Sequence, residues 1–185
     1  NPMVIRIPGL GYQKGFGGHF HNDNSIAALR DIPGLIVACP SRGDDAVTMM
    51  RTLTALSQVN KRVSIFIEPI ALYMQKDLYE EGDGLWNTAY PEPGHYTPLG
   101  QPRVYHGNAK DMLIITYGNG VLLSLKAAKR LAQTHQTQAR VLDLRWLQPL
   151  NEKAIKQIAG EFDKILIVDE GRRSACVGEG VITVF

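Results

Sequence analysis

The densest group of side chains that could do chemistry lies in the run Gly17-Gly18-His19-Phe20-His21-Asn22-Asp23-Asn24. On a strand, His19 and His21 would project from one face, and Asp23 could add an oxygen ligand to the two imidazoles. A metal site is therefore one interpretation of this run. No second cluster of ligands follows in the sequence, and loop histidines that cap turns are the alternative, so we predict no metal here.

Two glycine motifs imitate cofactor-binding signatures. Gly118-Asn119-Gly120 follows an expected strand and opens an expected helix, as in a dinucleotide fingerprint, but Leu123 stands where that fingerprint needs a small residue. Our interpretation is a tight strand-to-helix turn. Gly82-Asp83-Gly84 imitates a magnesium-diphosphate motif, which needs a buried strand before it and a helix behind it. Two glutamates precede it and a Pro-Glu-Pro segment follows, so we predict an exposed turn.

Two charged residues, Arg145 and Glu170, each follow an expected strand. Ligands of α/β proteins bind at the edge formed by the carboxyl ends of parallel strands, which makes both residues candidates for a binding site. The structural alternative is that the two charges pair with each other across that edge.

The elements that would position these residues alternate between strands and helices. Continuous apolar runs, such as residues 35–39, are typical of strands buried on both faces. The spacing of Val121, Leu125 and Ala128 indicates an amphipathic helix. Residues 76–107 are rich in proline and glycine and predict a long irregular connection between two lobes. Alternation of this kind predicts an α/β fold with buried, parallel strands.

The expected strands cover residues 4–7, 35–39, 63–67, 112–117, 141–144 and 165–168, and the expected helices include residues 24–30, 121–132 and 154–159. A further helix should start at the S-x-x-D pattern of Ser41 and Asp44. Its core-facing stripe would be Val47, Met50, Leu53 and Leu56.

Composition limits the class of protein. The chain has 185 residues, 44% of them apolar and 21% charged, with a formal net charge of +2. Since no long run of like charge occurs, we expect neither nucleic-acid nor membrane binding. Cys39 and Cys176 lie far apart, which fits a reducing cytoplasm. No signal peptide or membrane span is evident. Both termini have the character of boundaries within a larger protein.

A series of short phrases occurs in a fixed order along nearly the whole chain. They are Gly18-x-x-His21-(x)10-Ile32-Pro33-Gly34-Leu35, Pro40-Ser41, Asp45-Ala46, Phe66-Ile67-Glu68-Pro69-(x)2-Leu72-Tyr73, Leu99-Gly100, Thr116-Tyr117-Gly118, Asp143-Leu144-Arg145-Trp146-Leu147-x-Pro149-Leu150 and Val168-x-Glu170. Together they resemble beta subunits, or C-terminal halves, of the decarboxylating component of thiamine-diphosphate-dependent 2-oxo acid dehydrogenases. That family belongs to the wider transketolase-like group.

The resemblance implies parts of two three-layer, parallel-sheet domains. Residues 1–75 would be the second half of a pyrimidine-binding domain, residues 76–106 a linker, and residues 107–185 a truncated transketolase C-terminal-like domain. The family's glutamate that protonates the cofactor and its Gly-Asp-Gly magnesium motif would lie upstream. The resemblance therefore implies thiamine diphosphate and magnesium in the full-length protein, and weak or no cofactor binding by this chain alone.

The resemblance also implies roles and partners. His21 falls on the family's catalytic histidine, which serves substrate binding or acyl transfer, and imidazole suits proton exchange near neutral pH. His19 would be its companion in the cofactor pocket. The implied partners are an alpha subunit or N-terminal half, a lipoyl acyltransferase and a second copy of the chain. The alternative function is a non-catalytic dimerisation or docking module.

Overall fold

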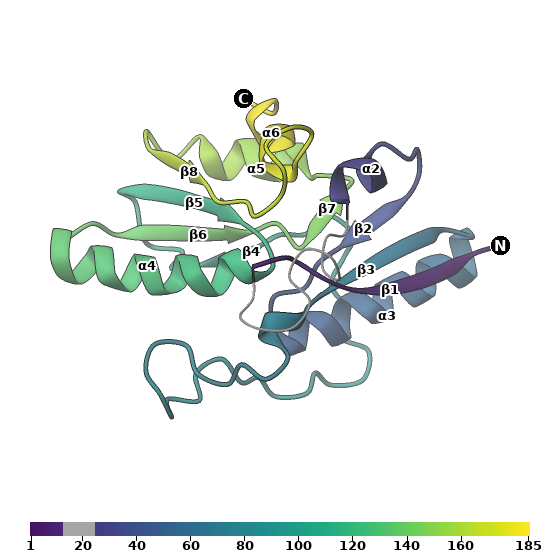
Figure 1. The fold of residues 1–185 in the computed structure, drawn as a ribbon, viewed down its shortest axis with the longest axis horizontal. Coiled ribbons are helices and arrows are strands. Elements are labelled where there is room, and N and C mark those ends of the chain that lie inside the picture. Colours follow the sequence, from purple (N-terminus) through teal and green to yellow (C-terminus); the bar gives the residue numbers. More distant parts are fainter. Residues whose placement is uncertain (13–24) are drawn as a thin grey trace.

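The computed structural model describes residues 1–12 and 25–185, which form two four-stranded sheets with helices against them (Figure 1). The strands are β1 (Met3–Gly9), β2 (Ile36–Ala38), β3 (Val63–Pro69), β4 (Arg103–Tyr105), β5 (Met112–Thr116), β6 (Ala139–Asp143), β7 (Trp146–Gln148) and β8 (Ile165–Ile167). The helices are α2 (Ile26–Arg30), α3 (Gly43–Asn60), the 3-10 turn η1 (Ile70–Leu72), α4 (Asn119–His135), α5 (Glu152–Ala159) and α6 (Val177–Ile182).

The first sheet has the order β1-β3-β2-β7. β1, β3 and β2 run parallel, whereas β7 is antiparallel to β2. Side chains alternate between the two faces of a strand, so Ile36 and Ala38 of β2 pack with Met49 and Leu53 of α3. Val37, between them, faces the opposite side and joins a cluster that includes Ile26 of α2.

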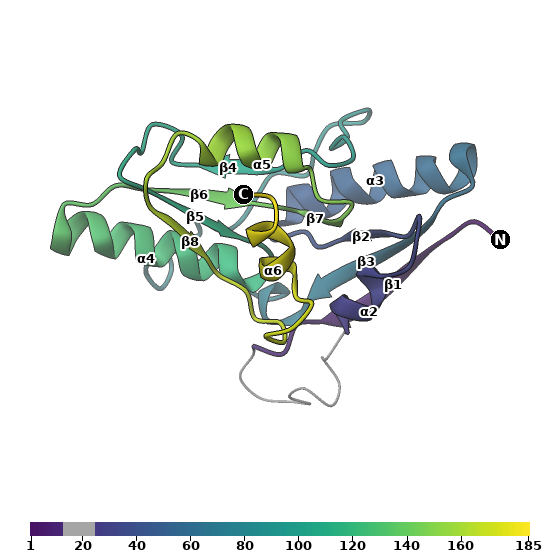
Figure 2. The same ribbon diagram turned by 90° about the horizontal axis from the view of Figure 1, so that it is seen from above.

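The second sheet has the order β4-β6-β5-β8, with β4 antiparallel and the others parallel. Helices α4 and α5 cover its opposite faces (Figure 2). Val121, Leu125 and Ala128 are buried on α4, as the spacing predicted. The predicted α/β class with mainly parallel sheets is confirmed, and the sequence missed one antiparallel strand in each sheet.

One apolar cluster extends across both sheets. It contains Ile65 and Ile67 of β3 together with Leu113 and Ile115 of β5 and Leu147 of β7. After β6 in the second sheet, the chain returns to the first sheet through β7. The two sheets therefore share buried contacts over a broad surface. The division of the chain at residues 75 and 107 stays a prediction.

The start of α3 differs from the prediction. The helix begins at Gly43, after Arg42 in extended conformation, and no side chain caps it. Ser41 is therefore not the cap. Asp44 lies within the first turn, where its carboxylate accepts the N–H of Asp45 at 3.0 Å. An acidic group at this place is also favoured by the helix dipole.

The buried face of α3 is also turned away from the predicted stripe. Met49 and Leu53 are fully buried, whereas Val47 and Met50 are only half-buried. The buried face carries polar residues as well, Asp45 and Thr52 among them. The apolar pattern missed this face because these polar side chains have partners from other elements, as described below.

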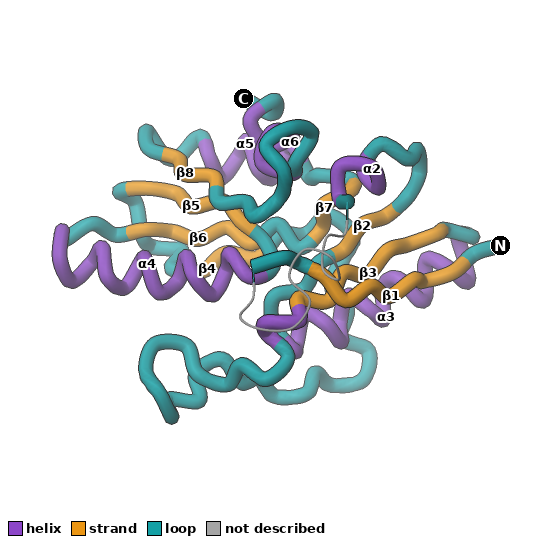
Figure 3. The backbone as a smooth tube through the Cα atoms, in the orientation of Figure 1, coloured by secondary structure: helices purple, strands orange, loops and turns teal. Residues whose placement is uncertain are grey.

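The segment between η1 and β4 is irregular, as predicted, and runs alongside both sheets (Figure 3). Side chains of α3 hold it in place. The Arg51 guanidinium donates to the carbonyls of Pro91, Glu92 and His95, and Thr52 Oγ1 donates to the carbonyl of Thr97 at 2.7 Å. The predicted irregular range was too long, because β4 pairs with β6 before residue 107.

The last strand of the second sheet is more exposed than predicted. Ile165 and Leu166 of β8 are 38% and 47% exposed, because β8 lies at the edge of its sheet and pairs only with β5 among the described strands. No helix in the described part of the chain is long and apolar enough to cross a bilayer.

Candidate functional site

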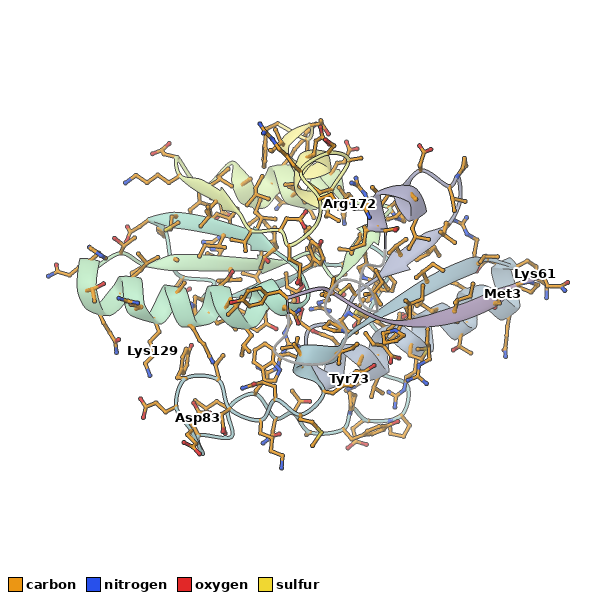
Figure 4. The ribbon with its side chains drawn as sticks, viewed as in Figure 1. Met3, Lys61, Tyr73, Asp83, Lys129 and Arg172 are labelled. Atoms are coloured by element: carbon orange, nitrogen blue, oxygen red, sulfur yellow. The ribbon has the colours of Figure 1, made fainter. Side chains whose placement is uncertain are left out.

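A crevice of about 500 Å³ lies where β1, β5 and β8 end. Leu10 and Gly11 follow β1, Tyr117 follows β5, and Glu170 follows β8, and all four line it. Further lining comes from Ser25, Ile26, Ala27 and Ala28 at α2 and from Gly171, Arg172, Ser174, Cys176 and Val177 before and within α6. Figure 4 labels Arg172, in the segment between β8 and α6. The carboxyl ends of parallel strands are the usual place for ligands in α/β folds.

The carboxylate of Asp169 fixes one wall of the crevice. It accepts the Tyr117 hydroxyl at 2.6 Å, the N–H of Gly171 at 2.7 Å and the N–H of Gly178 at 2.6 Å. Burial, followed by the nearby Asp169 charge, raises the pKa of Tyr117 well above its usual range. Tyr117 therefore stays a neutral hydrogen-bond donor, and the segment from β8 to α6 is tied to the end of β5.

Glu170 and Asn119 hold the chain that leaves β1. Glu170 Oε2 accepts the backbone N–H of Tyr12 at 2.8 Å, and Asn119 Nδ2 donates to the Tyr12 carbonyl at 3.2 Å. Asn119 Nδ2 also lies 3.4 Å from Glu170 Oε2. Burial raises the pKa of Glu170 above its ordinary value, although the Tyr12 N–H and Asn119 oppose the shift. Two acceptors, Glu170 Oε1 and Asn119 Oδ1, are buried with no hydrogen-bond partner among the described residues.

Gly118 and Gly120 form the tight turn between β5 and α4 that the sequence predicted. The N–H of Gly120 donates to the Tyr117 carbonyl at 3.0 Å. Gly118 has φ +54°, and a Cβ there would overlap Leu10 Cδ1 and meet Cys39 Sγ at 3.2 Å. Leu123, which stands where a dinucleotide fingerprint needs a small residue, is 41% exposed. The glycine at 118 therefore serves the packing of Leu10 against this turn.

The site residues predicted from the sequence do not all have the same outcome in the structure. His19, His21 and Asp23 lie outside the described residues, and their roles stay predictions. Residues on both sides of that segment, Gly11 and Ser25, line the crevice. Glu170 is brought to the crevice as its strand-end position indicated. Arg145 is not, and the alternative that it pairs with Glu170 is wrong, because Arg145 Nη1 pairs with Asp45 Oδ1 at 3.3 Å.

Arg145 belongs to a second polar group, buried between α3 and β4. Arg103 Nη1 contacts Asp44 Oδ2 at 2.9 Å and Asp45 Oδ2 at 3.0 Å. Asp143 Oδ1 accepts the N–H of Arg145 at 3.1 Å. Burial, reinforced by the charge of Asp45, raises the pKa of Asp143 to about 7. Desolvation likewise raises the pKa of Asp45, even though Arg145 and Arg103 lower it.

The Gly82-Asp83-Gly84 motif forms an exposed turn, as predicted, at the outer end of the irregular segment (Figure 4). The two carboxylate oxygens of Asp83 accept the N–H groups of Leu78, Tyr79, Glu80 and Leu85 at 2.7–2.9 Å. Its oxygens are thus occupied by the turn itself, so this motif does not fit a magnesium-diphosphate site. Within residues 1–12 and 25–185, no group of three or more His, Cys, Asp and Glu residues could hold a metal ion.

Sequence reasoning missed Tyr12 and Asn119. Tyr12 contributes only backbone atoms to the site, which no residue pattern reports. Asn119 offered one signal, because a polar residue between two glycines at a helix start is well placed for hydrogen bonds to a neighbouring chain segment.

Known proteins resemble this chain in sequence and in fold. Residues 103–185 match the family of the transketolase C-terminal domain. A solved structure described as a split gene transketolase, inactive beta4 tetramer, superposes with a TM-score of 0.70 at 18% identity, covering 98% of this chain and 52% of that one. A 2-oxoglutarate:ferredoxin oxidoreductase from Magnetococcus marinus gives a TM-score of 0.56 at 11% identity, over 80% of this chain and 37% of that one. Residues 103–185 thus match a transketolase domain family, and the chain has a transketolase-like fold over nearly its whole length.

The sequence relatives of the chain include beta subunits of 2-oxo acid dehydrogenases. The chain is 29% identical over 181 residues to the 3-methyl-2-oxobutanoate dehydrogenase subunit beta of Mycobacterium tuberculosis, covering 97% of this chain and 47% of that one. It is 32% identical to the pyruvate dehydrogenase E1 component subunit beta of Staphylococcus aureus, covering 98% and 50%. These relatives are beta subunits of 2-oxo acid dehydrogenases, as the sequence phrases predicted, and the chain spans about half of their length.

A relative with another printed activity also matches. The 1-deoxy-D-xylulose-5-phosphate synthase of Lawsonia intracellularis is 27% identical over 184 residues, covering 100% of this chain and 26% of that one.

Proposed function

We propose that the chain is part of the decarboxylating component of a 2-oxo acid dehydrogenase complex, which removes carbon dioxide from a 2-oxo acid and passes the acyl group to a lipoyl group. The observation that carries the proposal is the alignment of nearly the whole chain with beta subunits of such enzymes. The crevice at the strand ends supports it, because both flanks of the glycine-rich segment border that crevice.

Thiamine diphosphate would supply the carbanion chemistry. The crevice has the volume and the mixed apolar and polar lining that ring-sized ligands need, with Leu10, Ile26 and Val177 beside Tyr117 and Glu170. The described residues fit this organic part of the cofactor and not its magnesium-diphosphate end, because Asp83 is already occupied. We assign that end, with its magnesium ion, to an alpha subunit or N-terminal half.

His21 is the proposed acid-base residue, and His19 its companion in the cofactor pocket. An imidazole can give and take a proton near neutral pH, as both substrate binding and acyl transfer require. The proposed partners are the alpha subunit, a lipoyl acyltransferase and a second copy of the chain. The proposed location is the cytoplasm, which fits the free thiols of Cys39 and Cys176.

The proposal is tested on the complete protein with its partner subunit. Pyruvate, 3-methyl-2-oxobutanoate and 2-oxoglutarate are supplied one at a time with a dye as electron acceptor, thiamine diphosphate and magnesium. We expect dye reduction with at least one 2-oxo acid. In a separate reaction, pyruvate is supplied together with glyceraldehyde 3-phosphate. Formation of 1-deoxy-D-xylulose 5-phosphate and carbon dioxide there, without dye reduction in the first assay, would assign the chain to the synthase instead.

The alternative, a non-catalytic dimerisation module, has one observation in its favour. The exposed apolar residues of β8, Ile165 and Leu166, lie on a strand edge that another chain could cover. Leu166→Lys should then weaken self-association, measured by size-exclusion chromatography with light scattering. Leu123→Lys on α4, where the leucine is similarly exposed, is the matched control. A wild-type protein that stays strictly monomeric contradicts this alternative.

A further inference from the structure

A groove lies between α3 and the edge strand β1, on the face of the first sheet that α3 covers. It consists of two hollows, of about 560 Å³ and 480 Å³. Both hollows are lined by Arg6, Ala46, Phe66 and Glu68. Because they share these residues, the two hollows form one continuous site, the Arg6 groove.

Strand register brings the polar groups of the groove together. The parallel pairing of β1 with β3 places Arg6 beside Phe66, and Glu68 lies two residues further along β3. Side chains two residues apart project from the same face of a strand, so all three project toward α3. Phe66 packs there with Met49 of the helix. At the edge of the sheet, by contrast, the Arg6 side chain is 67% exposed.

Glu68 fixes the orientation of Arg6. Arg6 Nε donates to Glu68 Oε1, and the Tyr73 hydroxyl donates to Glu68 Oε2 at 2.6 Å. The hydrogen bond from Arg6 lowers the pKa of Glu68, helped by Tyr73 and opposed by burial, so the carboxylate stays charged. Among residues 1–12 and 25–185, the two terminal nitrogens of Arg6 have no hydrogen-bond partner. A guanidinium held at Nε presents these nitrogens as a fork that matches the two oxygens of a carboxylate.

Positive charge predominates in the lining of the groove. Three arginines line it, and Glu68 is its one acidic residue among those that the structure describes. Arg51 donates to backbone carbonyls. Arg42 Nε lies 4.0 Å from Asp44 Oδ1, and Arg103 already binds that carboxylate at 2.9 Å. An anionic ligand would therefore meet a net positive surface.

Much of the remaining lining is apolar or aromatic. These side chains come from α3, β3, η1 and the irregular segment, and they include Ala46, Met50, Phe66, Leu72, Tyr73 and Trp86. Figure 4 labels Tyr73, which follows η1. Mainly apolar pockets with a few well-placed polar groups are the usual sites for small ligands. A ligand that matches this groove has an apolar body and one anionic end.

We propose that the Arg6 groove binds a small carboxylic acid with an apolar body. Its carboxylate pairs with the terminal nitrogens of Arg6, and its body lies against Met50 and Phe66. The site is separate from the crevice, because the two share no lining residue among those described. The proposal goes beyond the proposed function and does not rest on it, because it concerns binding and not turnover.

The test uses 4-phenylbutanoate and its neutral amide as probes. Each is titrated into the complete protein, and the dissociation constant is measured by ligand-observed NMR. Hydrogen bonds between charged groups are stronger than neutral ones, so the acid should bind about tenfold or more tightly than the amide. Arg6→Gln should remove this preference by weakening the acid alone. Arg6→Lys keeps the charge without the fork and should retain part of the preference.

Two further variants locate the site. Tyr73→Ala removes an exposed aromatic ring from the groove and should weaken the acid and the amide alike. Arg172→Gln removes an exposed arginine from the crevice instead, and it should leave the binding of both probes unchanged. Thermal unfolding of each variant shows whether it is folded.

Equal affinity for the acid and the amide in the wild-type protein would overturn the proposal. A preference for the acid that survives Arg6→Gln but is lost in Arg172→Gln would place the acid in the crevice and overturn it as well. Failure of 2-oxo acid turnover would remove the proposed function and leave the result of these titrations unaffected.

Discussion

Carboxylates join the two sheets at two places. At the first, Asp45 of α3 binds Arg145 and Arg103, and neither Asp45 nor Arg145 is more than about a tenth exposed. At the second, Glu170 and Asn119 hold the backbone of Tyr12 beside an open crevice. The first group neutralises charge with charge. In the second group, a carboxylate and an amide bind a neutral peptide, and two of their acceptor atoms have no partner among residues 1–12 and 25–185.

The two groups should differ in how much they contribute to the free energy of unfolding. A buried ion pair is stabilising only as a whole, because removing one member leaves an unpaired charge in a poorly solvated place. Contacts to the backbone of an exposed residue such as Tyr12 contribute little to the folded state. The two groups should therefore respond differently to matched mutations.

The largest effect is expected for Arg145→Ala. Its loss leaves the buried Asp45 carboxylate with Arg103 alone, and breaking a buried pair of this kind costs about 3–5 kcal/mol. Urea unfolding measures the change. Arg130→Ala, on the exposed face of α4, is the control and should cost less than about 0.5 kcal/mol. Equal losses in the free energy of unfolding for the two variants would show that Arg145 is not part of a stabilising buried ion pair.

The next effect concerns pH. Asp143 has a pKa of about 7 in the folded protein, well above that of an unfolded aspartate, so the folded state binds the extra proton. Ionisation of Asp143 therefore lowers the free energy of unfolding as pH rises from about 4 to 7. The loss between pH 5 and pH 8 is roughly 2–3 kcal/mol. Asp143→Asn keeps an acceptor for the N–H of Arg145 and should remove this part of the slope. Wild-type and mutant stability curves that stay parallel across this range would contradict the assignment.

A smaller effect is expected for Gly118→Ala. The new Cβ would overlap Leu10, and the backbone conformation at φ +54° is unfavourable for alanine, which together cost about 1–3 kcal/mol. Gly34→Ala shares a positive φ of 78° but meets no neighbouring atom, so it isolates the cost of the backbone conformation. Thermal unfolding of both variants gives the difference. A cost no larger at 118 than at 34 would show that Leu10 is loosely packed.

The smallest effect on stability is expected for Glu170→Ala. The contact that it removes involves the exposed Tyr12, so the free energy of unfolding should change by less than about 1 kcal/mol. Chemical denaturation at pH 7 is the measurement. A loss comparable to that of Arg145→Ala would mean that the Glu170 contact is structural and would erase the distinction between the two groups.

The sequence predicted those parts of the fold that depend on apolar pattern. Residues 112–116 form a buried strand and residues 119–135 a helix because their apolar spacing agrees with their burial. β4 and β7 were missed because, unlike the equally short β2 and β8, neither was recognised as a separate apolar run, and each depends on pairing with a distant strand. The buried face of α3 was misplaced because Asp45 and Thr52 are buried with partners that lie far away in the sequence.

The sequence predicted a residue of the candidate site only where a reactive side chain directly follows an expected strand. Glu170 follows a strand and carries a carboxylate, so its place at the edge of the sheet could be expected. Its partner could not, because the N–H of Tyr12 is a backbone group 158 positions away and carries no side-chain signal. The pairing of Arg145 with Asp45 likewise depends on how the chain returns to the first sheet through β7.

We propose that the imidazole of His21 handles a proton of a 2-oxo acid or its acyl product. The most direct test is the rate of reductive acyl transfer to a lipoyl group by His21→Ala in the complete protein, with His106→Ala as the control in the second half of the chain. We expect a loss of about 100-fold or more for His21→Ala and no change for the control. Wild-type acyl transfer by His21→Ala would contradict it.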